Sequence, residues 1–235
     1  MKDLIVVTGG TKGIGRAIIK RFAANGFDII TCSRNFPDLE SLKIAVEKAY
    51  PGIEVYIFKS DLSEKKSAMK FINGVIGLNK HVTVLVNNIG SFISGQIHDE
   101  DEGTLEKMIE TNLYSGYHIT RGLIKAMMER KEGYVFNICS VAGIAPYLNG
   151  ASYCISKYAQ LGMTKVLREE MKPFGIRVTA IIPGSTLTAS WDGTELPESR
   201  FIESEDIANT IYNAWSLSKN TVIEEIIMRP QLGDV

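Results

Sequence analysis

The sequence predicts an α/β protein with one doubly wound parallel sheet of about seven strands and helices on both faces. Short apolar runs rich in Val and Ile alternate with longer helical patterns from one end of the chain to the other. The runs are apolar at nearly every position, which is typical of parallel strands that helices cover on both sides. The first run ends in a glycine-rich turn that opens a helix. These three observations favour a single domain over residues 1–235, with one crevice at the carboxyl ends of the strands.

In the first half of the chain, each predicted element is bounded by a recognisable signal. The first apolar run is closed by Thr8-Gly9-Gly10, and the helix after it ends near Asn25-Gly26. Pro37 opens the second helix, Pro51-Gly52 stop it, and Ser63 is predicted to cap the third. The predicted order is strand 4–7, helix 14–25, strand 27–32, helix 37–49, strand 55–58, helix 63–78 and strand 82–86.

Two long helices dominate the second half. The second of them is stopped by Pro173 and Gly175, and Ser204 is predicted to cap the last helix of the chain. The predicted order is helix 103–130, strand 134–138, helix 151–172, strand 176–182, helix 204–217 and strand 222–227. Because crossovers between parallel strands are short and right-handed, we expect the strand order 3-2-1-4-5-6-7, with the switch point beside the first strand.

Composition and charge exclude several classes of function. The chain has 235 residues, 45% of them hydrophobic, and a net charge of −1, so no charge excess favours nucleic acid or an anionic membrane as a partner. No apolar stretch is long enough to span a bilayer, and no signal peptide is expected. Three scattered cysteines favour a reducing cytoplasm. The histidines lack metal-ligand spacing, so no metal site is expected.

The turn Thr8-Gly9-Gly10-Thr11-Lys12-Gly13-Ile14-Gly15 is suited to bind a phosphate. Glycines let the backbone approach a pyrophosphate, and a helix N-terminus offers free N–H donors and positive dipole charge. The spacing is G-x-x-x-G-x-G rather than the commoner G-x-G-x-x-G. Such a turn can also be merely structural, but its place in the first βαβ unit favours dinucleotide binding.

The end of the second strand bears on which dinucleotide is bound. A site for NAD places a carboxylate there to hold the ribose hydroxyls, whereas this chain has Ser33-Arg34-Asn35. Arginine is suited to a 2′-phosphate, and Lys12 in the glycine-rich turn supplies a second cation. We therefore predict NADP(H) as the cofactor; the alternative is that Arg34 is only a solvated loop charge.

Tyr153 and Lys157 are four residues apart and share one face of a predicted helix. The pair alone is a weak signal. It gains weight from its place after a phosphate-binding turn, an Asn within a long helix and Ser140 at the end of a strand. Together these residues indicate hydride-transfer chemistry.

In this order the residues resemble the short-chain dehydrogenase/reductase family, with its Rossmann-type fold, over essentially the whole chain. The markers are Thr8 to Gly15, Asp61-Leu62, Asn87-Asn88-Ile89-Gly90, Asn112, Ser140, Tyr153 with Lys157, and Pro183-Gly184. Ile89 departs from the family's usual Ala, which should affect packing more than chemistry. The cofactor contacts that the turn, the second strand and the resemblance predict are Gly9, Thr11, Lys12, Gly13, Ile14, Gly15, Ser33, Arg34, Asp61, Leu62, Asn88, Gly90, Tyr153, Lys157, Pro183, Gly184 and Thr186.

The resemblance also implies a catalytic set. Tyr153 would be the general acid in carbonyl reduction and the base in alcohol oxidation. Lys157 would favour its phenolate and hold the nicotinamide ribose. Ser140 would hydrogen-bond the substrate oxygen, and Asn112 would organise a water-linked proton relay to Lys157. Taken singly, each residue has a structural alternative, such as a core aromatic, a turn residue, or for Asp61 a cap near Ser63.

Loops after the strands are expected to select the substrate. Residues 91–97 and 147–150 should form two walls, and 186–201 a short lid that carries Trp191. The lid is polar, with Ser190, Asp192, Thr194, Glu195 and Glu198, so a small or polar carbonyl is expected. The acidic run 98–102 is interpreted as a solvated helix start favoured by the helix dipole.

Several functions remain open at this point. The segment 224–230 resembles the carbonyl-reductase branch that includes sepiapterin reductases. The alternatives are a 3-oxoacyl-acyl-carrier-protein reductase and a non-catalytic NADP(H)-binding sensor. By resemblance we expect a homodimer or homotetramer built through the two long helices, where Leu161, Leu167 and Met171 could serve either core or interface.

Overall fold

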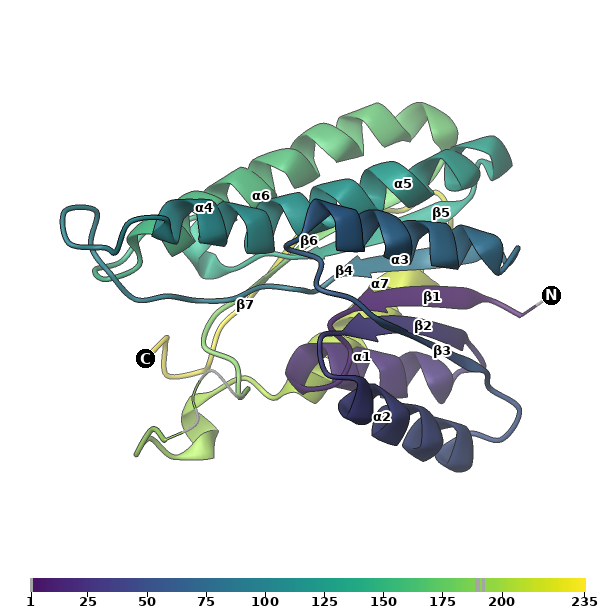
Figure 1. Ribbon diagram of the computed structural model, residues 1–235, viewed down its shortest axis with the longest axis horizontal. Coiled ribbons are helices and arrows are strands. Elements are labelled where there is room, and N and C mark those ends of the chain that lie inside the picture. The colour runs from purple at the N-terminus through teal and green to yellow at the C-terminus, as the bar shows by residue number, and fades with distance from the viewer. Residues whose placement is uncertain (1, 189–190, 192) are drawn as a thin grey trace.

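The computed structural model of the protein describes residues 2–188, 191 and 193–235, and a parallel sheet runs through its centre (Figure 1). The strand order is β3-β2-β1-β4-β5-β6-β7, which confirms the order expected from the sequence. Neighbouring strands pair in parallel throughout. The strands are β1 (Leu4–Thr8), β2 (Asp28–Ser33), β3 (Val55–Lys59), β4 (Val82–Asn87), β5 (Gly133–Ile138), β6 (Ile176–Pro183) and β7 (Glu225–Met228).

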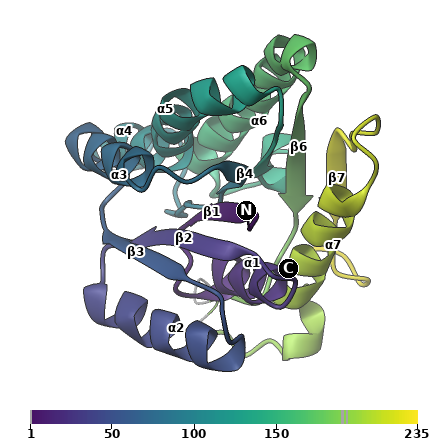
Figure 2. The same ribbon diagram turned by 90° about the vertical axis from the view of Figure 1, so that its right-hand side faces the viewer.

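Helices cover both faces of the sheet, as Figures 1 and 2 show. On one face lie α3 (Lys65–Gly77), α4 (Thr104–Ile109), α5 (Ser115–Arg130) and α6 (Ala151–Met171). On the other face lie α1 (Gly13–Ala23), α2 (Phe36–Ala49) and α7 (Ser204–Ser216). The amino ends of the strands lie on the side of the N-terminus, so the long loops on the opposite side surround the carboxyl ends.

The core has two main layers, one on each side of the sheet. Successive side chains of a strand point to opposite faces, so Ile5 and Val7 of β1 join the cluster under α1 and α7, while Leu4 and Val6 join the one under α3 and α5. All four side chains are buried. This explains why the strands are apolar at most positions rather than only at alternate ones.

Three local predictions were wrong at element boundaries. Ser63 does not cap α3, because its hydroxyl donates to Asp61 Oδ1 at 2.6 Å and the helix begins at Lys65. Ser204 is the first residue of α7 rather than its cap, and its hydroxyl donates to the Leu187 carbonyl at 3.2 Å. The last strand begins at Glu225 rather than at 222, and before it the carbonyls of residues 223 and 224 accept from the side chains of Thr179 and Arg168.

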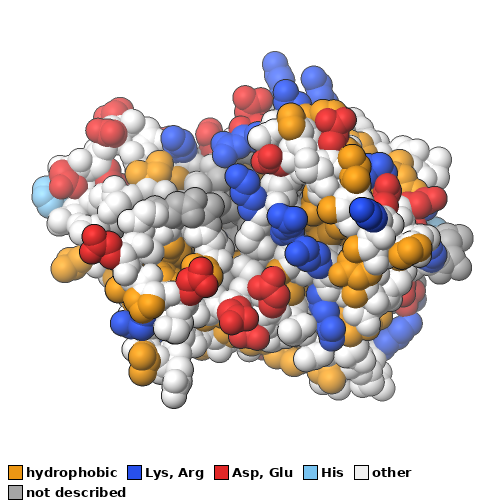
Figure 3. Space-filling view, turned by 90° about the horizontal axis from the view of Figure 1, so that it is seen from below, with side chains coloured by type: hydrophobic (Ala, Val, Ile, Leu, Met, Phe, Trp, Pro, Cys, Tyr) orange, Lys and Arg blue, Asp and Glu red, His pale blue; other side chains and the backbone are white. Residues whose placement is uncertain are grey.

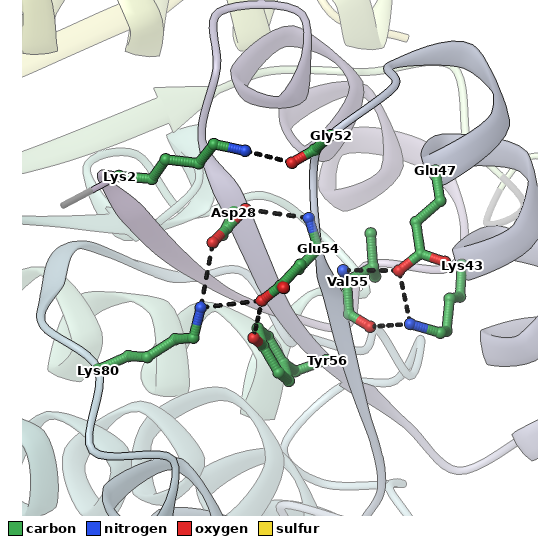
Figure 4. A network of polar contacts seen from close by, with 9 residues as sticks. All are labelled: Lys2, Asp28, Lys43, Glu47, Gly52, Glu54, Val55, Tyr56 and Lys80. Atoms are coloured by element: carbon green, nitrogen blue, oxygen red, sulfur yellow. Dashed lines mark hydrogen bonds and ion pairs between the residues drawn. The ribbon is translucent and has the colours of Figure 1, made fainter.

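A polar network ties the amino end of β2 to the edge strand β3 (Figure 4). The buried carboxylate of Asp28 accepts from the Glu54 N–H at 2.9 Å and pairs with Lys80 Nζ at 3.3 Å. Lys80 also pairs with Glu54 at 2.9 Å. Hydrogen bonds from Tyr56 and then from Lys80 lower the pKa of the Glu54 carboxyl. The network therefore keeps a buried charge paired where the chain enters the sheet.

Replacing Lys80 with methionine is expected to lower the free energy of unfolding by about 1–2 kcal/mol, because the Asp28 carboxylate would stay buried without its cation. The effect is limited because Lys80 itself is one-third exposed. Urea denaturation measures it. The matched control is Lys43→Met in the same network, whose partner Glu47 is much less buried than Asp28, with an expected cost of about 0.5 kcal/mol. Equal costs for the two variants would contradict the expectation.

Candidate active site

The residues singled out from the sequence lie at the carboxyl ends of the central strands. The glycine-rich turn follows β1, Asn88 and Gly90 follow β4, Ser140 follows β5, and Pro183 ends β6. Tyr153 and Lys157 lie in the first two turns of α6. Parallel strands bring these carboxyl ends to one edge of the sheet, where loops from distant parts of the sequence meet.

The turn after β1 has no room for side chains at its glycines. Gly9 and Gly13 have positive φ angles of 70° and 49°. A Cβ on Gly15 would lie 2.4 Å from the Gly9 carbonyl, and one on Gly9 would lie 2.9 Å from the side chain of Ile89. Ile89, the departure from the family's usual Ala, thus packs directly beneath the turn.

Hydrogen bonds to β2 and from the loop after β4 hold the first part of this turn: the Gly9 N–H donates to the Cys32 carbonyl and the Gly10 N–H to Thr31 Oγ1, both at 3.1 Å. Asn88 Nδ2 donates hydrogen bonds to the Thr8 and Gly9 carbonyls at 2.9 and 3.1 Å, so this side-chain amide joins the end of β4 to the turn. Lys12 is the exposed N-cap residue of α1, and within the described residues no side chain caps that helix. Thr11 is half-buried, and Ile14 packs against the core. A helix start with free N–H groups above a glycine surface fits a pyrophosphate.

At the end of β2, Arg34 extends into solvent beside Asp61. Its side chain is 81% exposed, and Nη1 lies 4.0 Å from Asp61 Oδ2, at the limit of an ion pair. Asp61 Oδ1 accepts from the Ser63 N–H at 3.1 Å and from its hydroxyl, so the carboxylate caps a turn, which was its structural alternative. Leu62 is a buried core residue, and Ser33 Oγ accepts from the Asn35 N–H. Arg34 is therefore held only weakly by the protein.

Basic side chains gather on the face of the molecule that carries α1, α2 and α7, where Figure 3 shows a band of Lys and Arg. Lys12, Arg16 and Lys20 are exposed and follow one another at helical spacing from the start of α1, and Arg34 is exposed after β2. Lys12 and Arg16 at the start of α1, together with Arg34, thus place positive charge beside the glycine-rich turn although the chain's net charge is −1.

Ser140, Tyr153 and Lys157 converge at the end of β5. Ser140 is nearly buried, and its Oγ accepts from the Ala142 N–H at 3.1 Å, which leaves its own proton free to donate. Lys157 is buried, and its Nζ donates to the Ile138 carbonyl at 3.1 Å and to Gln160 Oε1 at 2.9 Å. The same Nζ lies 5.8 Å from the centre of the Tyr153 ring.

Burial shifts the pKa values of Tyr153 and Lys157. It raises the pKa of the Tyr153 phenol, while the Ser140 hydroxyl lowers it. Burial also lowers the pKa of Lys157 to about 8. The sequence predicts that Lys157 depresses the pKa of the phenol. In the structure the Lys157 Nζ donates to the Ile138 carbonyl and to Gln160 Oε1, and it lies 5.8 Å from the centre of the phenol ring.

Asn112 lies in a π-helical turn, Glu110–Tyr114, that interrupts the predicted helix 103–130 between α4 and α5. Its side chain is buried. Oδ1 accepts from the Ser91 N–H at 2.8 Å, while Nδ2 donates to the Ser91 carbonyl at 3.0 Å and to Ser156 Oγ at 2.8 Å. A Cβ on Gly90 would lie 3.3 Å from both Asn112 Oδ1 and Lys157 Nζ. Asn112 therefore joins the loop after β4 to the helix of Tyr153.

The segment after β6 is braced by a residue that the sequence did not single out. Asp234 Oδ1 accepts from the Ser185 N–H at 3.0 Å, and the carboxylate pairs with Arg229. A Cβ on Gly184 would overlap this carboxylate at 1.9 Å. Gly184 thus makes room for Asp234, while Thr186 is buried and donates to the Gly184 carbonyl at 3.0 Å. No local signal marks Asp234, because its contact is with a segment 49 residues earlier.

The two predicted substrate walls touch each other and Tyr153. Phe92, which was not singled out within 91–97, packs its ring edge to face against Tyr153 with centroids 5.1 Å apart, and is still 46% exposed. Gly95 forms a parallel bridge with Gly150. Burial raises the pKa of Tyr147, and the neighbouring Tyr153 raises it further. The walls near the phenol are thus aromatic.

The two ends of the predicted lid, 186–201, are joined by a backbone bridge. Thr186 and Ile202 form a bridge, and Trp191 packs on Phe201 with ring centroids 5.0 Å apart. A Cβ on Gly13 would meet Thr188 at 3.0 Å, so the start of the segment lies against the glycine-rich turn. Ser190 and Asp192, counted among its polar residues, lie outside the described residues.

Over the described chain, no group of His, Cys, Asp or Glu is arranged to hold a metal ion. No helix among the described residues is long and apolar enough to cross a bilayer. The three cysteines are buried and free, and burial raises the pKa of Cys32 to about 12 and that of Cys139 to about 11. A raised pKa leaves less of the reactive thiolate at Cys32 and Cys139, which favours a packing role for these two side chains.

Comparison with known proteins gives a consistent result. The family model for short chain dehydrogenase matches residues 3–198. The chain is 30% identical to sepiapterin reductase of Chlorobaculum tepidum over 243 residues, which cover 100% of this chain and 99% of that protein. It is 31% identical to serine 3-dehydrogenase of Agrobacterium fabrum, over 98% of this chain and 94% of that protein.

Solved structures share the fold over nearly the whole chain. A metagenomic short-chain oxidoreductase in complex with NADP has a TM-score of 0.85 at 28% identity, over 97% of each chain. The closed form of serine dehydrogenase complexed with NADP⁺ has a TM-score of 0.84 at 25% identity, over 96% of this chain and 94% of that one.

Proposed function

This chain belongs to the short-chain dehydrogenase family, and from its site we propose that it is an NADPH-dependent reductase of a small-molecule carbonyl group, reversible as an alcohol dehydrogenase. The observation that carries the proposal is the convergence of Ser140, Tyr153 and Lys157 beside a glycine-rich turn fitted to a pyrophosphate. Aromatic walls beside the phenol leave an apolar surface for the body of a substrate.

The protein's own residues provide the proton and hold the substrate oxygen. Burial keeps Tyr153 protonated at neutral pH, so its phenol is the acid that protonates the carbonyl oxygen. Ser140 donates its free proton to the same oxygen as negative charge develops there. With a pKa of about 8, Lys157 is mostly charged at neutral pH and stabilises the phenolate that remains. When bound, NADPH supplies the hydride that the carbonyl carbon accepts.

Residues along the crevice would hold the cofactor. The first turn of α1 and the glycine surface suit the pyrophosphate, and Arg34 with Lys12 suits the 2′-phosphate. Two structural relatives of this chain are complexed with NADP and with NADP⁺, which supports the same cofactor here. Asn88, Gly90 and the segment 183–186 follow β4 and β6 at the same edge of the sheet and would hold the rest of the cofactor.

Arg34→Gln is expected to raise the KM for NADPH about ten- to a hundredfold and to leave the KM for NADH unchanged, because one charge-assisted contact is lost. Steady-state kinetics with both cofactors measures the ratio. Lys20→Gln, at an exposed position two turns into α1, is the control and should change neither value. An unchanged preference in Arg34→Gln would show that Arg34 is only a solvated charge.

Turnover against a panel of carbonyl compounds tests the function. The panel contains ketones, aldehydes, diketones and acyl thioesters. Sepiapterin is added as a substrate for reduction and serine as a substrate for oxidation, because two relatives of this chain are named for acting on them. NADPH oxidation with any of the carbonyl compounds, or NADP⁺ reduction with serine, supports the proposed oxidoreductase, and the best substrate defines its class. NADPH binding with no turnover on the whole panel would instead favour a non-catalytic NADP(H)-binding sensor.

We propose that residues 186–201 are a substrate lid on a single catalytic domain. Its two ends are joined by the Thr186–Ile202 bridge, and Thr188 lies over the glycine-rich turn, so the segment is placed to cover a bound cofactor. The three free thiols favour a reducing compartment such as the cytoplasm.

We also propose that two copies of the chain associate through α5 and α6. Leu161 and Met171, offered from the sequence for core or interface, are buried in the core. The apolar side chains that α6 exposes are Ile155, Tyr158 and Val166, at 43, 44 and 58%. Tyr114 and Tyr117 are exposed at the start of α5, and Gly162 of α6 leaves open space for close approach. An apolar groove of about 550 Å³ continues this face past Ile155 and Tyr158.

Val166→Glu is expected to convert a homodimer or homotetramer into smaller species at micromolar concentration, because a charge would be buried at the contact. Light scattering after size-exclusion chromatography measures the mass. Ile44→Glu is the control, since Ile44 is 67% exposed on α2, away from this face. A monomeric wild-type protein would remove the proposal.

A further inference from the structure

The helix that carries Tyr153 and Lys157 begins without a cap from its own sequence. Its N-cap residue is Gly150, and within the described residues no side chain next to it accepts from the first turn. A helix start leaves its first N–H groups without intrahelical partners, and leaving them unpaired in a buried place costs free energy. Ser152 is buried at this point, so its N–H needs an acceptor.

The acceptor comes from the opposite wall of the site. Glu100 Oε1 accepts from the Ser152 N–H at 3.0 Å, and Oε2 accepts from the Ser152 hydroxyl. The preceding N–H, that of Ala151, donates to the Gly95 carbonyl at 3.2 Å. A carboxylate at a helix N-terminus also interacts favourably with the helix dipole. The acidic run 98–102 thus does serve a helix start, but that of α6 rather than that of α4, whose N-cap is Gly103.

The loop is shaped to bring Glu100 to this position. A Cβ on Gly95 would lie 2.5 Å from Glu100 Cγ, so only glycine lets the side chain fold back across the loop. The Gly95 N–H donates to the Asn149 carbonyl at 3.0 Å, and Gln96 Nε2 donates to Asn149 Oδ1 at 3.0 Å. These contacts join both substrate walls at the residues directly before α6.

The other end of the same loop contacts the catalytic group. The Asn112 side chain hydrogen-bonds both the N–H and the carbonyl of Ser91, and the ring of Phe92 packs on Tyr153. Residues 91–100 therefore contact the catalytic helix at three points: Phe92 packs on the Tyr153 ring, the Gly95 carbonyl accepts from the Ala151 N–H, and Glu100 accepts from Ser152. Tyr153 directly follows Ser152, the residue that Glu100 holds.

We propose that Glu100 is a positioning residue, which caps the catalytic helix from the opposite substrate wall and thereby fixes the Tyr153 phenol relative to Ser140. The inference rests on the reductase function proposed above. A displacement of the acid by about 1 Å can cost a hundredfold in rate, so a loosened helix start should reduce turnover while cofactor binding, which depends on other elements, is retained.

Two substitutions of Glu100 test the proposal. Glu100→Ala is expected to lower kcat at least tenfold with the KM for NADPH within twofold of wild type. Glu100→Gln should stay within threefold of wild type in kcat, because its amide oxygen can still accept from the Ser152 N–H. The matched control is Glu102→Gln, an exposed carboxylate two residues on, which should have no effect. Hydrogen exchange of peptides covering 147–156 should be faster in Glu100→Ala alone.

Several outcomes would overturn the proposal. They are a kcat for Glu100→Ala within twofold of wild type, a Glu100→Gln as impaired as the alanine variant, or unchanged exchange over 147–156. If Glu100→Ala does not fold, Ser152→Ala removes only the hydroxyl contact and should lower kcat about threefold with NADPH binding intact; no change there overturns the proposal. Hydrogen exchange needs no turnover, so a wild-type protein that reduces no carbonyl defeats the proposed function while the capping role is still decided.

Discussion

Replacing Tyr153 with phenylalanine is expected to lower kcat by about 10²–10⁴-fold, the usual contribution of a positioned general acid. The ring and its contact with Phe92 would remain, while the proton donor would be lost. Because the substitution removes only one hydroxyl and leaves the helix unchanged, the affinity for NADPH should change less than threefold. Stopped-flow or steady-state NADPH oxidation measures kcat, and the change in NADPH fluorescence on binding measures affinity.

The same helix offers the control for this variant. Tyr158 is 44% exposed on the outer face of α6, so Tyr158→Phe should retain full activity. A Tyr153→Phe variant that keeps a tenth or more of the wild-type kcat would mean that another group delivers the proton, and the proposed mechanism would have to be abandoned.

Lys157→Met is the second substitution with a large expected effect. It should lower activity and change the pH dependence of the free energy of unfolding. Activity should fall at least a hundredfold, because the charge that stabilises the phenolate is removed. Stability should respond to pH in a defined way. The pKa of Lys157 is about 8 in the folded protein and about 10.4 in the unfolded chain. Between these values the unfolded state binds more protons, so the stability contributed by this group rises with pH.

Below pH 8 the buried charge carries its full cost, which is about 3 kcal/mol at most for a shift of this size. The lost hydrogen bonds to Ile138 and Gln160 offset part of the gain in the methionine variant. Relative to wild type, Lys157→Met should therefore be more stable at pH 7 than at pH 10. Urea denaturation at both pH values measures this difference, with the exposed Lys165→Met as control. A difference independent of pH would show that Lys157 is not destabilised by burial.

The strand order could be predicted because its signals are local. Each strand is a short apolar run bounded by turn residues, and right-handed crossovers leave few possible orders for seven of them. The glycine-rich turn and the Tyr153–Lys157 pair are also local, since a spacing of four residues on a helix places both side chains on one face. The helix boundaries were predicted wrongly at Ser63 and Ser204. A serine hydroxyl that caps a helix in one context donates to a neighbouring carboxylate or a distant carbonyl in another.

The site's supporting contacts were not predictable in the same way. The π-helical turn at Asn112 depends on Ser91 and Ser156, which are 21 and 44 residues away in sequence. Periodicity over 103–130 indicates one continuous helix, because apolar spacing reports the buried face and not the partner of a single polar side chain.

The sequence by itself determined the sheet, its strand order, the glycine-rich turn and the family to which the chain belongs, because these depend on neighbours in the chain or on motif order. Only the tertiary structure decided that Asp234 fills the space above Gly184, that Phe92 packs on Tyr153 and that Glu100 caps a helix 52 residues further on. It also decided the pKa shifts of Tyr153 and Lys157. The physical reason is that burial and hydrogen bonding arise between segments that only the folded sheet brings to one edge.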